Sequence, residues 1–317
     1  MPRKSKSKRI AGFFIKLLVI LAVFTSISFG GYLILDKAVI PSYFGKYGIN
    51  DMGDLVRMVR VMHNAPDEKT FITNPYTKEN ETSALSKLEA AGVPIYNGEI
   101  EFSKIADGEY DITEEAQQGI FISDKEMTAI IAQMFRSDYL LSVEFFKNLE
   151  YFDTISIEAK EIIVDFEDND VEVDGAFTFS KKAHVSFTIK IDTKTAQTIM
   201  AKRMDVPYFL LDLIMPDFLY MTTSYDIEVL EDEGYRITNA AIGVNGRTPK
   251  QSKILLNMLL TFIFPQDDNM TISKLGETFA VSLNDGMNIL GDIKFCQAKI
   301  GGKTQNGIMV SVKPDID

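Results

Sequence analysis

Apolar residues recur with a helical period over residues 119–135, the clearest local pattern in the chain. The spacing i, i+3, i+4, i+7, i+8 places side chains on one face of an α-helix. The residues at this spacing are Met127, Ile130, Ile131, Met134 and Phe135. Ser123 and Glu126 precede them with the spacing of a capping box. The pattern predicts a capped helix with one continuous apolar face.

The period then changes to the alternation that is typical of half-buried β-strands. Apolar residues alternate over 155–166, 171–179 and 183–191, and their parity changes near Lys160 and Glu161. The parity change predicts a β-bulge in the first strand. The three segments together predict an antiparallel meander with one apolar face.

The remaining patterns predict helices and antiparallel strands in separate blocks. Strands are expected in a hairpin over 225–244 that turns at 232–234, and around Ile293 and Ile308. Helices are expected over 55–62, with Asn50 or Asp51 as the cap, and over 250–264 and 273–290, whereas the polar residues 64–83 predict a loop. This blockwise order favours an α+β fold over parallel βαβ winding.

Residues 17–35 are uncharged and mostly apolar, and a helix of this length can cross a ~30 Å hydrocarbon core. Six basic residues and no acid occupy residues 1–16, so the N-terminus is expected in the cytoplasm and residues 38–317 outside. A cleaved secretory signal is the alternative, because Ser26 and Ser28 have the spacing of a peptidase site. The length of the apolar run favours an uncleaved, single-pass anchor in the cell membrane.

Four segments follow from these predictions. They are a basic cytoplasmic tail at 1–16, a transmembrane helix at 17–35, a juxtamembrane helix with a loop-rich segment at 36–118, and an α+β extracytoplasmic domain at 119–317.

Charge and cysteine content narrow the classes of partner. The chain carries a net charge of −12 although its first sixteen residues are basic, so the rest is strongly acidic. Such a domain lacks the basic footprint of a nucleic-acid binder, and an anionic membrane surface would repel it. Cys296 is the only cysteine, which excludes an intrachain disulfide and is typical of a bacterial envelope protein. We interpret it as a small buried hydrophobe.

Candidate catalytic and metal-binding residues are few. His63 and His184 have no cysteine or second histidine nearby, so a zinc site is not expected. The residues GGKT at 301–304 resemble the end of a phosphate loop, but Gln297 stands where its first glycine belongs, and a glycine hairpin is favoured. The sequence therefore predicts no cofactor, no metal and no enzymatic activity.

Two carboxylate-based alternatives stay open at this point. The acidic residues 165–175 could form a calcium loop, although Lys181 would replace its closing Glu, and acids on the solvent face of a hairpin are favoured. Paired carboxylates for glycosidic chemistry are the other alternative, because their geometry is spatial and no spacing reveals it.

Two apolar stretches, at 206–221 and 254–265, are too short to be further spans and contain proline. They either pack on the 127–135 stripe as core, or line a long apolar groove with room for an acyl chain. The predicted lining consists of Met127, Ile131, Phe135, Phe209, Leu213, Leu256 and Leu260.

The chain also resembles a known architecture. A helix opening with ISDKEMTAII, followed by the strands IEAKEIIVDF and AHVSFTIKID, is similar in layout to tubular lipid-binding (TULIP) proteins. With the short basic tail and single span, it resembles the YpmS-like anchored proteins of Gram-positive bacteria. The resemblance implies a long curved antiparallel sheet wrapped around a helix, an apolar tunnel, and a lipid or another hydrophobic ligand in place of a catalytic centre.

Three functional hypotheses follow. The first is a membrane-anchored extracytoplasmic protein that binds or shields a hydrophobic envelope ligand, a lipid or lipid-linked precursor. The second is a scaffold or regulator that docks on a protein partner in the cell envelope through an exposed apolar patch. The third is an enzyme, which buried carboxylates converging in one pocket would support.

Overall fold

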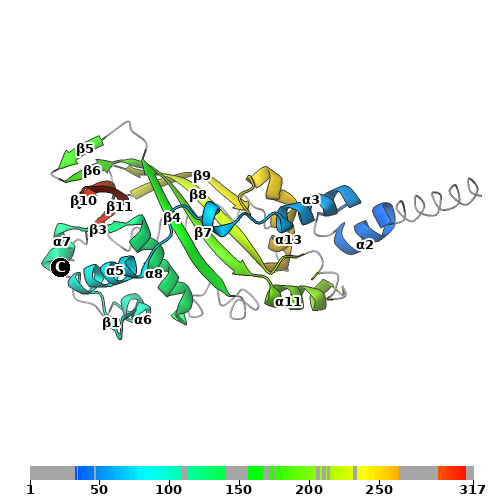
Figure 1. Cartoon of the computed structure of the whole chain (residues 1–317), viewed down its shortest axis with the longest axis horizontal. Helices are drawn as coiled ribbons and strands as arrows, with labels where there is room; N and C mark the ends of the chain where they lie inside the picture. Colours follow the sequence, from blue (N-terminus) through cyan, green and yellow to red (C-terminus); the bar gives the residue numbers. More distant parts are fainter. Residues whose placement is uncertain are drawn as a thin grey trace, which may run out of the picture. The chain divides into compact units, whose positions relative to one another are not determined.

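The protein is an α+β chain in which every paired strand of the described part is antiparallel, as predicted (Figure 1). The chain divides into two compact units, Met1–Met58 and Val59–Asp317. The computed structural model describes residues 33, 35–45, 48–108, 113–139, 156–166, 171–174, 176–204, 208, 212, 215–230, 234–263 and 292–311.

The first unit contains the π-helix η1 (Leu35–Val39) and α2 (Ile40–Phe44), and helix α3 (Met52–His63) begins in it. The start of α3 is capped as predicted, because the Asp54 amide donates to Asp51 Oδ1 at 2.8 Å. Of the predicted span at 17–35, only residues 33 and 35 are described. Within the part of the chain that the structure places, no helix is both long and apolar enough to cross a membrane.

The segment 64–83 is not the uninterrupted loop that its polarity predicted. It contains the short helix α4 (Glu68–Phe71) and the first half of α5 (Lys78–Ala90). The amide of Asn80 donates to Thr77 Oγ1, and the Thr77 amide donates to the Asn80 side chain in return. Only one residue of α5, Ala84, is fully buried, so the helix has no strong apolar period to reveal it in the sequence.

Helix α8 (Asp124–Arg136) confirms the predicted capping box, and residues 120–123 before it form strand β3 (Ile120–Ser123). The Ser123 amide donates to Glu126 Oε2 at 2.8 Å, and the Glu126 amide donates to Ser123 Oγ at 3.3 Å. The buried Glu126 carboxylate also accepts from Lys87 Nζ at 2.7 Å and Ser83 Oγ at 2.5 Å. The cap therefore ties α5 to α8 as well as starting the helix.

A four-stranded sheet has the order β4, β7, β8, β9. These strands are Ile157–Phe166, Lys182–Asp192, Phe218–Leu230 and Gly234–Val244. The pairing of β4 with β7 shifts register between Ala159 and Glu161, which confirms the predicted bulge. Strands β8 and β9 confirm the predicted hairpin, although its turn at 231–233 lies outside the described residues.

A five-stranded sheet has the order β3, β11, β10, β6, β5. The new strands are β5 (Val171–Asp174), β6 (Phe177–Ser180), β10 (Asp292–Ile300) and β11 (Lys303–Ser311). The predicted meander is wrong here, because β4 pairs directly with β7 while the β5–β6 hairpin joins β10 in this second sheet. Ser180 Oγ bonds both the amide and the carbonyl of Lys182, at the point where the chain passes from one sheet to the other. Alternation in the sequence indicates which face of a strand each side chain occupies, but not which strands pair. It therefore could not distinguish these two pairings.

The turn between β10 and β11 confirms the glycine hairpin at GGKT. Gly301 and Gly302 have φ values of +58° and +76°, which glycine adopts without steric cost. The acidic residues 165–175 span the end of β4 and strand β5, and 167–170 and 175 are not described. The hairpin expected across them is wrong, because β4 pairs with β7 and β5 pairs with β6 in the other sheet.

Helix α13 (Pro249–Ile263) confirms the helix predicted over 250–264, whereas residues 273–290 lie outside the described ranges. Helix α11 (Lys194–Met204) was not predicted. The apolar stretch 206–221 is not one unit, since β8 begins inside it at Phe218. Small elements complete the described part: β1 (Ile95–Tyr96), β2 (Glu99–Ile100), α6 (Phe102–Ala106) and α7 (Glu114–Gln118).

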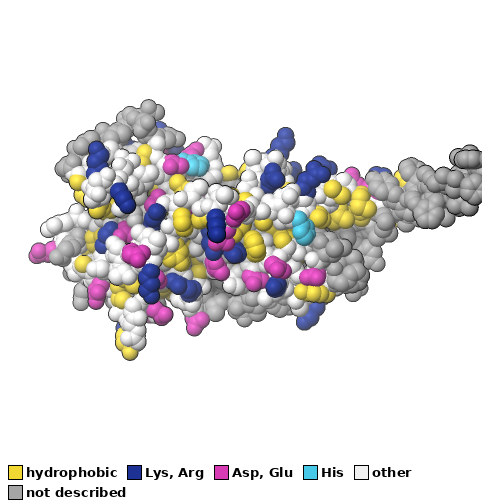
Figure 2. Space-filling model, viewed as in Figure 1, with side chains coloured by type: hydrophobic (Ala, Val, Ile, Leu, Met, Phe, Trp, Pro, Cys, Tyr) yellow, Lys and Arg dark blue, Asp and Glu magenta, His cyan; other side chains and the backbone are white. Residues whose placement is uncertain are grey.

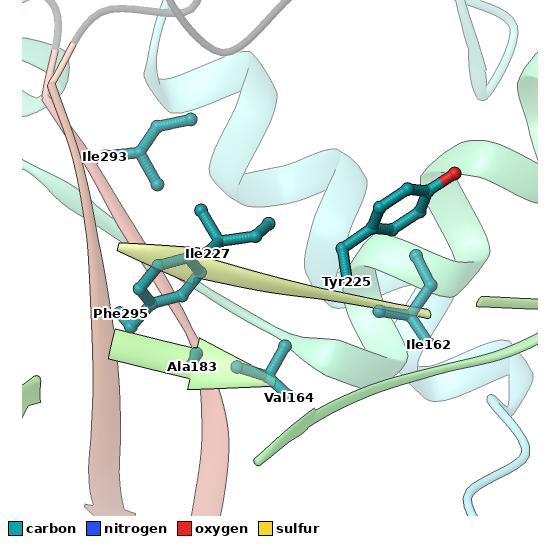
Figure 3. Close-up of a cluster of buried hydrophobic side chains, with 7 residues drawn as sticks. All are labelled: Ile162, Val164, Ala183, Tyr225, Ile227, Ile293 and Phe295. Carbon is teal, nitrogen blue, oxygen red and sulfur yellow. The ribbon is translucent and has the colours of Figure 1, made fainter. Parts of the chain in front are cut away.

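The main hydrophobic core lies where the two larger sheets meet (Figure 3). Its buried members are Ile162, Val164, Ala183, Tyr225, Ile227, Ile293 and Phe295. The first five come from the four-stranded sheet, and Ile293 and Phe295 come from β10. Polar side chains form hydrogen bonds with backbone groups at the outer edge of β4. Thr128 Oγ1 accepts from the Ile162 amide at 2.8 Å, and Asn306 Nδ2 donates to the Val164 carbonyl at 2.8 Å. Strand β4 is therefore an edge strand whose buried Ile162 amide and Val164 carbonyl are both hydrogen-bonded.

Candidate functional site

Helix α8 presents part of its predicted apolar stripe to the four-stranded sheet. Met127 and Ile131, one helical turn apart, pack against the core. One turn further, the ring of Phe135 lies parallel to that of Phe187 on β7, with centroids 6.2 Å apart and an interplanar angle of 5°. All three stripe residues are half-buried. The helix thus lies along the apolar face of the sheet and leaves part of its own stripe accessible.

The apolar face of the sheet extends beyond the fully buried core. Directly paired residues of antiparallel strands share a face, so Ile162, Phe187 and Thr223 form one row, and Phe166, Ala183 and Ile227 another. In the described part of the chain, ten half-buried apolar side chains surround the seven buried ones. They are Met127, Ile131, Phe166, Val185, Phe187, Val229, Tyr235, Ile237, Ile308 and Val310. We call this set, together with Phe135, the apolar rim.

The structure assembles part of the predicted lining. Met127, Ile131 and Phe135 belong to the apolar rim. Leu256 is buried in α13, a helix that packs on β9, and it is not a member of the core or of the residues around it. Phe209 and Leu213 lie outside the described residues, and nothing is described of the Leu260 side chain.

The opposite face of the same sheet is polar and carries a histidine–carboxylate pair. Asp165, His184 and Asp226 are directly paired across β4, β7 and β8. His184 Nδ1 lies 2.6 Å from Asp226 Oδ1, and Asn239 Nδ2 donates to Asp226 Oδ2 at 2.6 Å. The His184 hydrogen bond and then that of Asn239 lower the pKa of the Asp226 carboxyl. His184 lies on this polar face, but its partner Asp226 lies 42 positions away in the sequence, so no local spacing could reveal the pair.

This pair has the geometry that orients an imidazole, but its surroundings favour a structural role. The side chains of His184 and Asp226 are 43% and 31% exposed, and exposed ion pairs contribute about 1 kcal/mol or less. Within the described ranges, no group of three or more His, Cys, Asp or Glu side chains is placed to hold a metal ion. We interpret the pair as a cross-strand contact of the sheet.

A second polar cluster fixes α4 on this face. Glu68 accepts from the Tyr220 hydroxyl at 2.6 Å, from Lys160 at 2.9 Å and from Lys190 at 3.2 Å. The Tyr220 hydrogen bond, followed by the two lysines and opposed by burial, lowers the pKa of Glu68 to about 2. Figure 2 shows basic and acidic side chains in contact at the centre of this view, where the helical turn before α5 crosses the sheet in Figure 1.

The buried Glu161 extends this attachment along the same segment. Its Oε2 accepts from the amides of both Thr73 and Asn74 at 2.9 Å. The segment that follows α4 is therefore held by a carboxylate from the bulge of β4. The polar face is partly covered, and the apolar face remains the larger candidate for ligand contact.

Comparisons with protein-family models, with curated proteins and with solved structures give no match to this chain.

Proposed function

We propose that this is a single-pass membrane protein, anchored by residues 17–35, whose extracytoplasmic domain binds or shields a hydrophobic envelope ligand, a lipid or lipid-linked precursor. The ligand's acyl chain lies along the apolar rim between α8 and the four-stranded sheet. The protein acts by binding, without catalysis.

The apolar rim carries this proposal. Among the described residues, half-buried apolar side chains outnumber the fully buried ones, ten to seven, around the main core. A water-exposed apolar surface costs about 25 cal/mol per Å² relative to burial, so an acyl chain that covers it gains free energy without any specific polar contact. The antiparallel strands packed on α8 also fit the arrangement that a tubular lipid-binding architecture would need.

Photo-crosslinking tests the proposal on the full chain. The protein is purified in mild detergent and transferred to vesicles that contain a phospholipid with a diazirine in its acyl chain. After irradiation, mass spectrometry is expected to find adducts on the peptides that carry Met127, Ile131 and Phe187. Phe135→Ser should reduce these adducts, because it removes a ring from the rim. Ile300→Ser, at an exposed hairpin end, is the matched control and should leave them unchanged.

Adducts confined to residues 17–35 would contradict ligand binding by the rim and support the anchor alone. Labelling of the rim with no adduct in 17–35 would contradict the anchor. The two parts of the proposal are thus tested separately.

A second candidate function is docking on an envelope protein, and the β1–β2 hairpin favours it. Tyr96 is 67% exposed at the start of a turn formed by Asn97 and Gly98, with φ values of +52° and +80°. Tyrosine is enriched among the residues that carry most of the binding energy at protein interfaces. A photo-reactive amino acid at Tyr96 should then crosslink one protein partner in cells, while the same amino acid at the exposed Glu99 should crosslink less.

A further inference from the structure

An acid-free stretch occurs in this otherwise acidic chain. Residues 234–266 contain no Asp or Glu, but they contain Arg236, Arg247, Lys250 and Lys253. Arg236 forms an ion pair with Glu228 at 3.0 Å. The other three basic residues have no ion-pair partner among the described residues. Within the described part of the chain, no carboxylate therefore neutralises their charge.

These three residues lie at the start of α13 and are exposed. Lys250 and Lys253 are three positions apart, so they project from neighbouring positions on one side of the helix. In Figure 2, dark-blue side chains gather over the start of this helix as located in Figure 1. On the opposite side of α13, Leu255 and Leu256 are buried and Ser252 Oγ accepts from the Val244 amide at 3.1 Å. The helix is thus fixed with its basic side outward.

The last turn of α3, which lies beside the start of α13, carries a fourth exposed basic residue. Asn245, two positions before Arg247, donates from Nδ2 to the carbonyls of Val61 and Met62, both at 2.9 Å. These bonds hold the last turn of α3 beside the start of α13. Arg60 in that turn is exposed and has no ion-pair partner among the described residues. We call Arg60, Arg247, Lys250 and Lys253 the basic face.

We propose that the basic face binds the anionic head groups of the membrane to which the chain is anchored. This rests on the anchor in the proposed function and not on the apolar rim. Arg60 lies only 25 residues after Leu35, the end of the predicted span. Leu35–Phe44 and the start of α3 are helical, so this part of the chain covers a short distance per residue. The basic face is tethered close to a lipid surface.

Charge complementarity selects the side that faces the membrane. An anionic surface repels the strongly acidic remainder of the extracytoplasmic part and attracts each nearby Lys or Arg by about 1 kcal/mol. The domain therefore orients with the start of α13 toward the head groups. Acyl chains and head groups of the same lipids would then be contacted by different surfaces of the protein.

Lysine footprinting tests this orientation on the unmodified full chain. The protein is placed in nanodiscs of phosphatidylcholine, with or without phosphatidylglycerol, and acetylated briefly before mass spectrometry. In discs with phosphatidylglycerol, Lys250 and Lys253 should react about fivefold more slowly than in neutral discs, and raised salt should remove the difference. Lys299 and Lys303, exposed at the far hairpin, are the internal control and should react equally in both.

Equal reactivity of Lys250 and Lys253 in both kinds of disc would overturn the inference while leaving the anchor intact. Failure of the chain to enter either disc would instead contradict the anchor. Polyphosphate is added to the protein in detergent as a further probe. If it protects Lys250 and Lys253 as strongly as the anionic discs do, the basic face is a general polyanion site and its assignment to the membrane is wrong.

Discussion

The Tyr220 hydroxyl donates a hydrogen bond of 2.6 Å to Glu68, across 152 positions of the chain. Tyr220 is fully buried in β8, whereas the Glu68 side chain is 42% exposed in α4. Burial, and then the neighbouring Glu68, raise the pKa of Tyr220 well above its usual value. The bond therefore joins a strand of the core to a short surface helix, and the same carboxylate forms ion pairs with Lys160 and Lys190.

Glu68 should make stability depend on acid pH. Its pKa of about 2 in the folded protein lies below the ordinary 4.5, so its stabilisation is present above pH 4.5 and is lost as the pH falls toward 2. Because the side chain is partly exposed, we expect Glu68→Gln to lower the free energy of unfolding at pH 7 by only about 1 kcal/mol. Urea unfolding followed by circular dichroism should show a smaller loss between pH 5 and pH 2 in the variant. An unchanged pH slope would contradict this.

The elements that could be predicted are those whose signals are local. The Ser123–Glu126 capping box, the bulge after Ala159 and the glycine turn at Gly301 each depend on a few neighbouring residues, and all three are present. Residues 171–179 were expected as the middle strand of a single meander, but they form the β5–β6 hairpin of the five-stranded sheet. Alternation fixes which face a residue occupies and does not determine which strand lies beside it.

The same distinction applies to the candidate site. Met127, Ile131 and Phe135 come from one helix, and their common face follows from its period. Leu256 is equally apolar, but its helix, α13, packs on β9. The position of α13 depends on the long-range order of the strands, which the local sequence does not show. The His184–Asp226 and Glu68–Tyr220 contacts were missed for this reason too, since their partners are 42 and 152 positions apart.

Thr128 should be essential for the edge of β4. Its hydroxyl donates to the Asp124 carbonyl at 2.8 Å and accepts from the Ile162 amide at 2.8 Å, and the side chain is fully buried. Thr128→Val keeps the volume but leaves both backbone groups without this partner, which should cost about 2 kcal/mol of unfolding free energy. Thr128→Ser keeps the hydroxyl and should cost clearly less in the same urea titration. Equal losses would show that packing, and not the hydrogen bonds, is what Thr128 contributes.

Gly307 should tolerate no side chain, because β3 and β11 approach closely at this position. A Cβ there would collide with the Ile122 carbonyl oxygen and lie 2.7 Å from Ser123 Cα, both of them backbone atoms. Ser123 is also the N-cap of α8, so the collision would disturb the start of that helix. We expect Gly307→Ala to destabilise the fold by about 3 kcal/mol.

Gly302→Ala is the control for this prediction. Its φ of +76° disfavours alanine, but no atom lies within 4 Å of the added Cβ, so the cost should be about 1 kcal/mol. Thermal unfolding of the two variants, monitored by circular dichroism, compares them directly. A Gly307→Ala variant as stable as Gly302→Ala would show that β3 can move away from β11 freely.

Asn245 should be the least replaceable residue near the basic face. Its Oδ1 accepts from the Tyr220 amide at 2.9 Å while Nδ2 donates to the Val61 and Met62 carbonyls, and its φ is +51°. Asn245→Asp keeps the shape but turns an oxygen toward two carbonyl oxygens, so it should cost about 3 kcal/mol or more. Asn245→Gly loses all three side-chain bonds, but it brings no oxygen–oxygen repulsion, relieves the positive φ and allows water to enter, so it should cost less than Asp. Urea unfolding should therefore rank the wild type as most stable, the Gly variant next and the Asp variant last. An Asp variant more stable than the Gly variant would mean that the Val61 and Met62 bonds do not hold α3 against the sheet.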